Sequence, residues 1–168
     1  MSFWKKIFGS DSVGGTGADD ARLTPEQLEE LSAKPIARNR MDLLWLDPQT
    51  FELLAITGGA NILTDDGAGG AHPLQCTPED IKWAKEVAAY AEEAHKAGQR
   101  GDHTAAIRHY REALKLAPGC DNYLMSIGCC YGNMGNKKIG LKYLERAAEI
   151  SPGNERIRKN LAGLRRII

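Results

Sequence analysis

Two stretches in the second half of the chain repeat each other at an offset of 34 residues. The offset aligns residues of matching type: Gly101 with Gly135, Asp102 with Asn136, Ile107 with Leu141, Ala113 with Ala147, Pro118 with Pro152 and Gly119 with Gly153. Such a period, with glycine near the middle and proline near the end, is typical of a helix–turn–helix unit that stacks on copies of itself. Residues 77–168 are therefore predicted to form a helical repeat domain.

The residue types suit the packing of such helix pairs. Small residues stand where the two helices of each unit would cross, namely Ala94 and Ala106 in the first unit and Gly128 and Gly140 in the second. Larger apolar residues surround them: Tyr90, Ile107, Tyr110 and Leu114, then Leu124, Ile127, Tyr131, Leu141 and Leu144. Gly101 and Gly135 fit the turns between the helices, where Asp102 and Asn136 can cap the helix that follows.

The segments AEEAHKAGQRGDHTAAIRHYREALKLAPG and LMSIGCCYGNMGNKKIGLKYLERAAEISPG closely resemble tetratricopeptide repeats. Two positions depart from the family pattern, because Glu93 and Arg158 stand where the family carries apolar residues. The resemblance implies an all-α fold of two repeats, followed by a C-terminal capping helix over residues 154–168. The buried side of that helix would carry Ile157, Leu161, Leu164 and Ile168.

The residues before the repeat domain divide into three segments. Residues 1–20 end in a run of Gly, Ser and Asp with too little apolar surface to fold, which predicts a flexible N-terminal tail. Residues 21–57 contain helix starts at Thr24-Pro25 and Asp47-Pro48 and are predicted to form a small helical segment, with a β-hairpin over 43–56 as the alternative. Residues 58–76 are Gly-rich and are interpreted as a flexible linker.

Two repeats are fewer than such stacks normally need, so another segment is expected to cover the first repeat. The apolar run over residues 41–56, with Trp45 and Phe51, is the natural cover, and residues 21–57 are predicted to cap the repeat. Self-association through the same surface is the alternative. Residues 19–75 carry ten acidic and four basic side chains, and residues 81–168 nine acidic and sixteen basic ones. This opposition of charge leaves a further alternative, in which the acidic segment occupies the groove of the repeat.

Several kinds of chemistry find no support in the sequence. The cysteines and histidines form no zinc or nucleophile pattern, so no metal, no cofactor and no enzymatic activity are expected. In the Cys129-Cys130 pair, neighbours on a helix point about 100° apart, so one thiol is expected in the core and the other in the groove. The basic helix near the C-terminus lacks a reading motif for nucleic acid. With no secretory signal and no apolar stretch of bilayer length, a cytoplasmic protein is predicted.

The amino terminus resembles a weak membrane anchor. Phe3, Trp4, Ile7 and Phe8 would share one face of a short helix, with Lys5 and Lys6 toward the other face. That arrangement is typical of a helix lying in the plane of a membrane, although two turns give little affinity. A short peptide that docks on a protein is the alternative.

The resemblance also implies a function. In the family, the first helices of successive repeats line a concave groove that binds a peptide of another protein. The corresponding residues here are His95, Gln99, Asn122, Ser126, Cys129, Asn133, Arg156, Lys159 and Asn160. The carboxylate clamp of some family members is absent, because its five positions carry Ala91, His95, Ser126, Arg156 and Asn160. The groove is polar and its far end is positive, which predicts an acidic peptide as partner. A non-catalytic adaptor or assembly factor is therefore expected, with a membrane-surface scaffold tethered by residues 1–8 as the alternative.

Overall fold

The computed structural model describes residues 22–57, 63–65 and 71–168. Over these residues the fold is all-α, as predicted, with eight helices and one short two-stranded ribbon. The helices are α2 (Pro25–Ser32), α3 (Arg38–Leu43), α4 (Pro48–Thr57), α5 (Pro78–Gln99), α6 (His103–Leu116), α7 (Asp121–Asn133), α8 (Lys137–Ile150) and α9 (Glu155–Arg165). The expected tail, with Phe3, Trp4, Ile7 and Phe8, lies outside the described residues.

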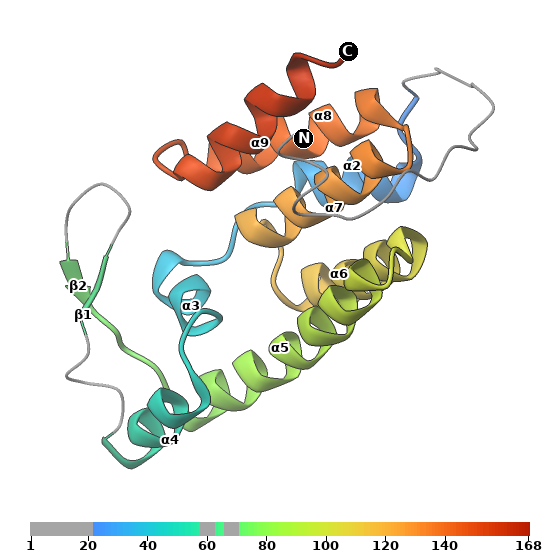
Figure 1. Cartoon of the computed structure of the whole chain (residues 1–168). Coiled ribbons are helices and arrows are strands. Elements are labelled where there is room, and N and C mark those ends of the chain that lie inside the picture. Colours follow the sequence, from blue (N-terminus) through green and yellow to red (C-terminus); the bar gives the residue numbers. More distant parts are fainter. Residues whose placement is uncertain (1–21, 58–62, 66–70) are drawn as a thin grey trace.

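The helices α5 to α8 form two antiparallel helix pairs, and α9 packs after them (Figure 1). Each pair turns at a glycine in the left-handed region, with φ of +80° at Gly101 and +86° at Gly135. Asp102 caps α6, because its carboxylate accepts a hydrogen bond of 2.9 Å from the backbone N–H of Ala105. Asn136 occupies the same position before α8 but makes no capping bond with its side chain.

The second pair crosses closely at Gly128 and Gly140, as predicted. A Cβ atom on Gly128 would lie 2.9 Å from the carbonyl oxygen of Gly140, and one on Gly140 would lie 2.6 Å from that of Gly128. Neither distance is compatible with an undisturbed side chain, so glycine at both positions sets how closely α7 and α8 approach.

Most of the predicted core residues of the repeats are buried, including Ile107, Leu114, Leu124 and Leu144. Tyr90 is a correction, because 37% of its surface is exposed. It lies on the first helix of the stack, where no earlier repeat is present to cover it.

The capping helix α9 follows the prediction with one exception. Ile157, Leu161 and Leu164 are buried on its inner side, whereas Ile168 is 58% exposed. The helix ends at Arg165, so the chain beyond it no longer follows the helical spacing that would return Ile168 to the core.

The segment before the repeat is helical over 48–57, so the structure has the helix rather than the hairpin there. Local signals account for its helices. Thr24 and Gln27 form a reciprocal capping box on α2, and the Asp47 carboxylate accepts a 2.7 Å hydrogen bond from the backbone N–H of Thr50 at the start of α4. The apolar residues Phe51 and Leu54 of α4 are buried, and both α3 and α4 contact α5.

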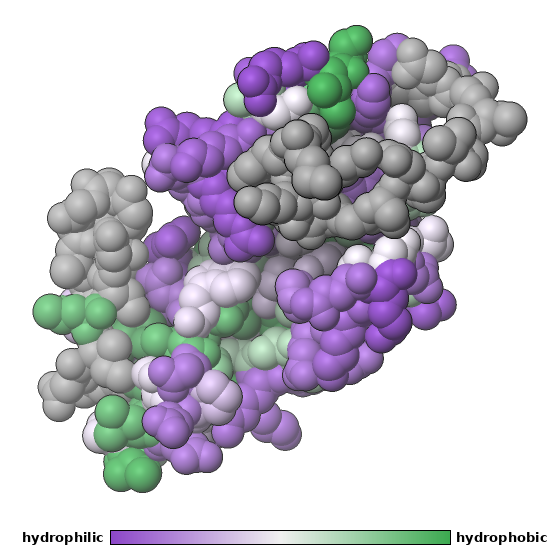
Figure 2. Space-filling model, in the orientation of Figure 1, coloured by the Kyte–Doolittle hydropathy of each residue, from purple (hydrophilic) through white to green (hydrophobic). Residues whose placement is uncertain are grey.

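The expected flexible linker contains a short regular element. Strand β1 (Leu63–Asp65) pairs antiparallel with β2 (Ala71–Pro73), with Leu63 opposite Pro73. Residues 58–62 and 66–70 lie outside the described residues. Apolar side chains of this ribbon and of α4 remain exposed, namely Leu53, Ile56 and Leu63. Figure 2 shows green surface at the lower left, in the region where Figure 1 places α4 and the two strands.

Candidate functional site

A cavity of about 140 Å³ lies between the first helices of the two repeats and the capping helix. It is lined by Ala94, His95, Gly98 and Gln99 of α5, His103 and Tyr110 of α6, Met125, Ser126, Cys129 and Cys130 of α7, and Arg156 and Asn160 of α9. We call this cavity and the three helices that frame it, α5, α7 and α9, the groove. Six of the nine residues predicted for peptide binding line the cavity: His95, Gln99, Ser126, Cys129, Arg156 and Asn160.

The other three predicted residues lie outside the cavity. Asn122 stands one turn before Ser126, and its backbone carbonyl accepts a 2.9 Å hydrogen bond from the Ser126 hydroxyl. Lys159 is exposed and forms a 2.7 Å ion pair with Glu155. Asn133, at the end of α7, has a buried side-chain nitrogen without a hydrogen-bond partner in the described structure.

The polar side chains that line the cavity interact with neighbouring residues or are enclosed by them. His95 and Gln99, one turn apart on α5, are joined by a hydrogen bond of 3.0 Å. Burial lowers the pKa of His103, whose Nδ1 atom is enclosed and has no partner among the described residues. Burial also raises the pKa of the Tyr110 hydroxyl, against the smaller opposing effect of the nearby Ser126 side chain. Sequence reasoning did not place His103 and Tyr110 in the groove, because both belong to the second helix of the repeat.

The two adjacent cysteines correct another prediction. Cys129 and Cys130 are both buried, with exposed fractions of 4% and 6%, and both line the cavity. The helix α7 lies in the middle of the stack and contacts α6, α8 and α9, so side chains 100° apart are both covered. Burial raises the pKa of each thiol to about 12, which keeps both protonated at neutral pH.

The far end of the cavity carries the positive charge of Arg156. Arg156 lies close enough to Tyr110 and Cys129 for its charge to lower the pKa of both groups, against the larger effect of burial. The structure gives Arg156 no ion pair within its described residues, whereas Lys159 and Arg165 on the same helix are paired with Glu155 and Glu145. The cavity therefore offers a cation to an incoming anionic group.

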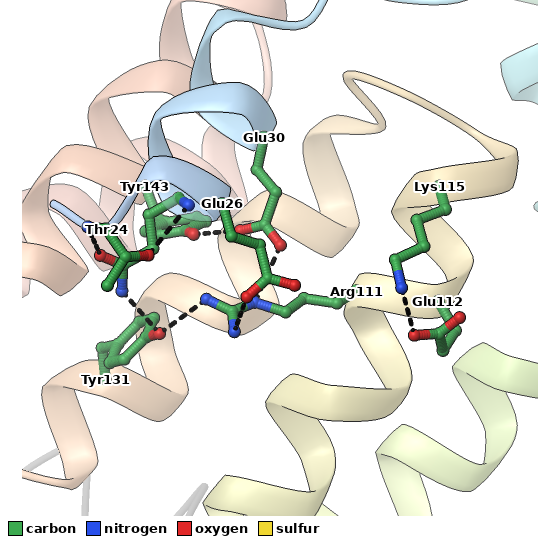
Figure 3. Close-up of polar contacts among 9 residues, drawn as sticks. Thr24, Glu26, Glu30, Arg111, Glu112, Lys115, Tyr131 and Tyr143 are labelled. Atoms are coloured by element: carbon green, nitrogen blue, oxygen red, sulfur yellow. Dashed lines mark hydrogen bonds and ion pairs between the residues drawn. The ribbon is translucent and has the colours of Figure 1, made fainter.

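The acidic N-terminal segment meets a different face of the repeat (Figure 3). Glu30 of α2 lies 2.8 Å from Nε of Arg111 on α6, and Glu26 lies 3.0 Å from the same guanidinium group. The Tyr143 hydroxyl of α8 donates a hydrogen bond to Glu30, which adds a contact to the second repeat. Burial raises the pKa of Glu30 despite the adjacent Arg111.

An amide hydrogen bond completes the contact of α2 with the repeats. The side-chain amide of Gln27 donates a 2.8 Å hydrogen bond to the hydroxyl of Tyr131, which also accepts one of 3.1 Å from Arg111. No residue of α2, α3 or α4 lines the cavity of the groove. The described acidic helix therefore packs on the α6 and α8 side.

Two kinds of feature are absent from residues 22–57, 63–65 and 71–168. No group of three or more His, Cys, Asp or Glu side chains is placed there to hold a metal ion. None of the helices in those ranges has the length and apolar character required to cross a bilayer.

Comparison with known proteins agrees with the helix pairs. A family model described as tetratricopeptide repeat matches residues 87–120 and 122–154, which correspond to the second part of α5 with α6 and to α7 with α8. Searches of curated proteins and of solved structures found no significant match. Two successive helix pairs with glycine turns, together with this match, show that residues 87–154 form two tetratricopeptide repeats, units that generally act as protein–protein interaction modules.

Proposed function

We propose that this chain is a non-catalytic adaptor or assembly factor that holds a peptide segment of a partner protein in the groove. The observation that carries the proposal is the cavity itself. The cavity lies between α5, α7 and α9, and polar side chains from all three helices line it. A space of about 140 Å³ suits one or two side chains of a bound peptide rather than a whole folded element.

The charge of the cavity favours an acidic side chain on the partner. Arg156 at the far end has no ionic partner in the described part of the chain, and Ser126 and Asn160 also line the cavity. A carboxylate that enters the cavity would gain charge-assisted hydrogen bonds from the guanidinium group, which are stronger than those between neutral groups. The neutral thiols of Cys129 and Cys130 add no repulsion, because their raised pKa leaves them uncharged.

The N-terminal segment, in this proposal, completes the short stack and leaves the groove free. Its helix α2 pairs with Arg111 on the α6 and α8 side, and α3 and α4 cover part of α5.

The four cysteines are free and buried, which fits a protein that works in the reducing cytoplasm.

A comparison of two charge reversals on α9 tests the proposal. Arg156→Glu inverts the charge in the cavity, and Arg158→Glu makes the same change at an exposed position outside it. Each full-length variant and the wild-type chain serve as bait in cell extract, and retained proteins are measured by quantitative mass spectrometry. We expect a set of partners that wild type and Arg158→Glu retain and Arg156→Glu loses. The same proteins on all three baits would rule out the groove as the binding site.

A further inference from the structure

A row of three aromatic rings connects the N-terminal segment with the groove. The ring of Trp45, which follows α3, lies 5.7 Å from that of Tyr123 at the start of α7. Tyr123 in turn lies 5.9 Å from Tyr110, which lines the cavity. Tyr123 is almost fully buried, whereas Trp45 keeps 48% of its surface exposed. The row therefore runs from the lining of the cavity to a large, half-exposed ring.

Trp45 is held in place by a well-anchored segment. Arg40 of α3 forms a 3.0 Å ion pair with Asp80 and lies over the ring of Trp83, with its guanidinium carbon 4.3 Å from the ring centroid. Trp83 donates a 2.9 Å hydrogen bond from Nε1 to the carbonyl of Leu116. These contacts fix α3 on α5 shortly before Trp45, and the Trp45 ring itself packs on the buried ring of Tyr123. Little conformational entropy would therefore be lost on binding to it.

We propose that Trp45 forms an apolar subsite for the same peptide whose acidic side chain enters the cavity, so that the N-terminal segment takes part in recognition. This inference rests on the proposed function of the groove. The occupant is an extended peptide segment of a partner protein, with a large apolar side chain on Trp45 and an Asp or Glu at Arg156. Packing of the rings of Tyr123 and Tyr110 connects the Trp45 ring to the lining of the cavity, and the charge of Arg156 selects the acidic member of the pair.

The ring positions limit the distance from Trp45 to the lining of the cavity, where the acidic side chain is placed. Two steps of 5.7 and 5.9 Å separate the Trp45 ring from the Tyr110 ring at the cavity. An extended chain rises about 3.3 Å per residue. The apolar side chain should therefore stand roughly three to five residues from the acidic one. Aromatic or long aliphatic residues fit best, since an indole ring offers both apolar area and favourable ring stacking.

Selection from a random peptide library tests the inference and needs no identified partner. Twelve-residue peptides on phage are selected on the full-length chain, and the affinities of the enriched peptides are then measured by fluorescence anisotropy. The variants are Trp45→Ala, Arg156→Glu and Ile56→Ala, the last as a control because Ile56 is an apolar residue of α4 that is 83% exposed and lies outside the ring row. Thermal unfolding of each variant checks that the fold is retained.

We expect enriched peptides to carry an acidic residue and, three to five positions away, a large apolar one. Trp45→Ala should weaken them about tenfold, as for the removal of an aromatic anchor, and Ile56→Ala should leave them unchanged. Because Trp45→Ala could loosen α3, a second measurement uses the wild-type chain. Titration with peptide should shift the indole N–H signal of Trp45 in a ¹H–¹⁵N spectrum and leave that of Trp83 in place, since Trp83 is bonded to Leu116.

The outcomes separate the two proposals. Peptides that depend on Arg156 but not on Trp45, and that leave the Trp45 signal unmoved, would overturn the subsite and leave the groove standing. Peptides that are insensitive to Arg156→Glu would overturn the groove itself. A library that yields no specific binder would overturn both.

Discussion

The close crossing of α7 and α8 makes a sharp prediction for Gly128→Ala. The added Cβ would lie 2.9 Å from the carbonyl oxygen of Gly140, 2.9 Å from Cγ of Leu144 and 3.2 Å from its backbone nitrogen. Two of these three atoms belong to the backbone of α8 and cannot rotate away, so the whole helix must shift. Forcing one methyl group into such a contact typically costs about 1–3 kcal/mol, whereas alanine gains about 1 kcal/mol over glycine from helix propensity.

Gly132 provides a matched control one turn later on the same helix. There a new Cβ would meet only the methyl groups of Leu164, at 3.4 and 3.9 Å, which is ordinary van der Waals contact. Gly132→Ala should therefore keep the gain in helix propensity, about 1 kcal/mol. We expect a net loss of about 1–2 kcal/mol for Gly128→Ala, because the rigid backbone contacts place its cost near the upper end of that range.

Thermal unfolding followed by circular dichroism at 222 nm measures the difference between the two variants. Their free energies of unfolding should differ by about 2–3 kcal/mol, which for a chain of this length corresponds to roughly 4–12 °C in Tm. Gly128→Ala should be the less stable of the two. If it is as stable as Gly132→Ala, the two helices do not approach as closely as these distances require, and the reasoning is refuted.

Three further predictions concern capping, proton binding and thiol burial. Asp102→Ala should cost about 1 kcal/mol because a capping bond to α6 is lost, whereas Asn136→Ala should cost clearly less because Asn136 makes no such bond; equal costs in urea unfolding would contradict the difference. Burial raises the pKa of Glu30 above its ordinary value of 4.5, so the folded state holds the Glu30 proton more tightly than the unfolded state does. The binding of this proton therefore contributes its full stabilisation below pH 4.5, and the stabilisation is lost as the pH rises through the pKa of the folded state. The stability of wild type relative to Glu30→Gln should accordingly fall as the pH is raised from about 4 to about 7, and a rise would refute the direction. With Cys129 and Cys130 at a pKa of about 12 and all four thiols buried, a disulfide reagent at mildly alkaline pH should label the folded chain slowly and the chain in guanidinium rapidly; one fast thiol in the folded chain would contradict this.

The parts of the fold that depend on local signals could be predicted from the sequence. Thr24 caps the helix that follows it, and Gly101 and Gly135 form the two predicted turns in the left-handed conformation. These features depend on residues a few positions apart, and the repeat supplies each of the turn signals twice. The close approach of Gly128 and Gly140 could also be predicted, because the family pattern fixes which faces of the two helices meet.

The features that were missed depend on contacts between distant residues. Gln27 reaches Tyr131 across 104 positions of sequence, and no pattern near either residue indicates the pairing. Tyr110 and His103 line the cavity although they belong to the second helix of the repeat, and helical spacing alone does not reveal this. Cys130 is buried together with Cys129 because α7 is covered on several sides, a property of the assembled stack.

The position of the N-terminal segment has a consequence for how the chain unfolds. In an open helical repeat each unit interacts only with its neighbours, so the ends can fray and one unit can melt while the next persists. Here α3 and α4 hold the first helix of the stack, and α2 reaches Tyr143 in the second repeat. The N-terminal segment thereby connects the first helix of the stack with the second repeat. Loss of either repeat breaks contacts of the other, so amide protons in α6 and α8 should exchange through the same global opening. These contacts of the N-terminal segment also join residues that are far apart in sequence. Folding should therefore be slower than in an open stack of equal length.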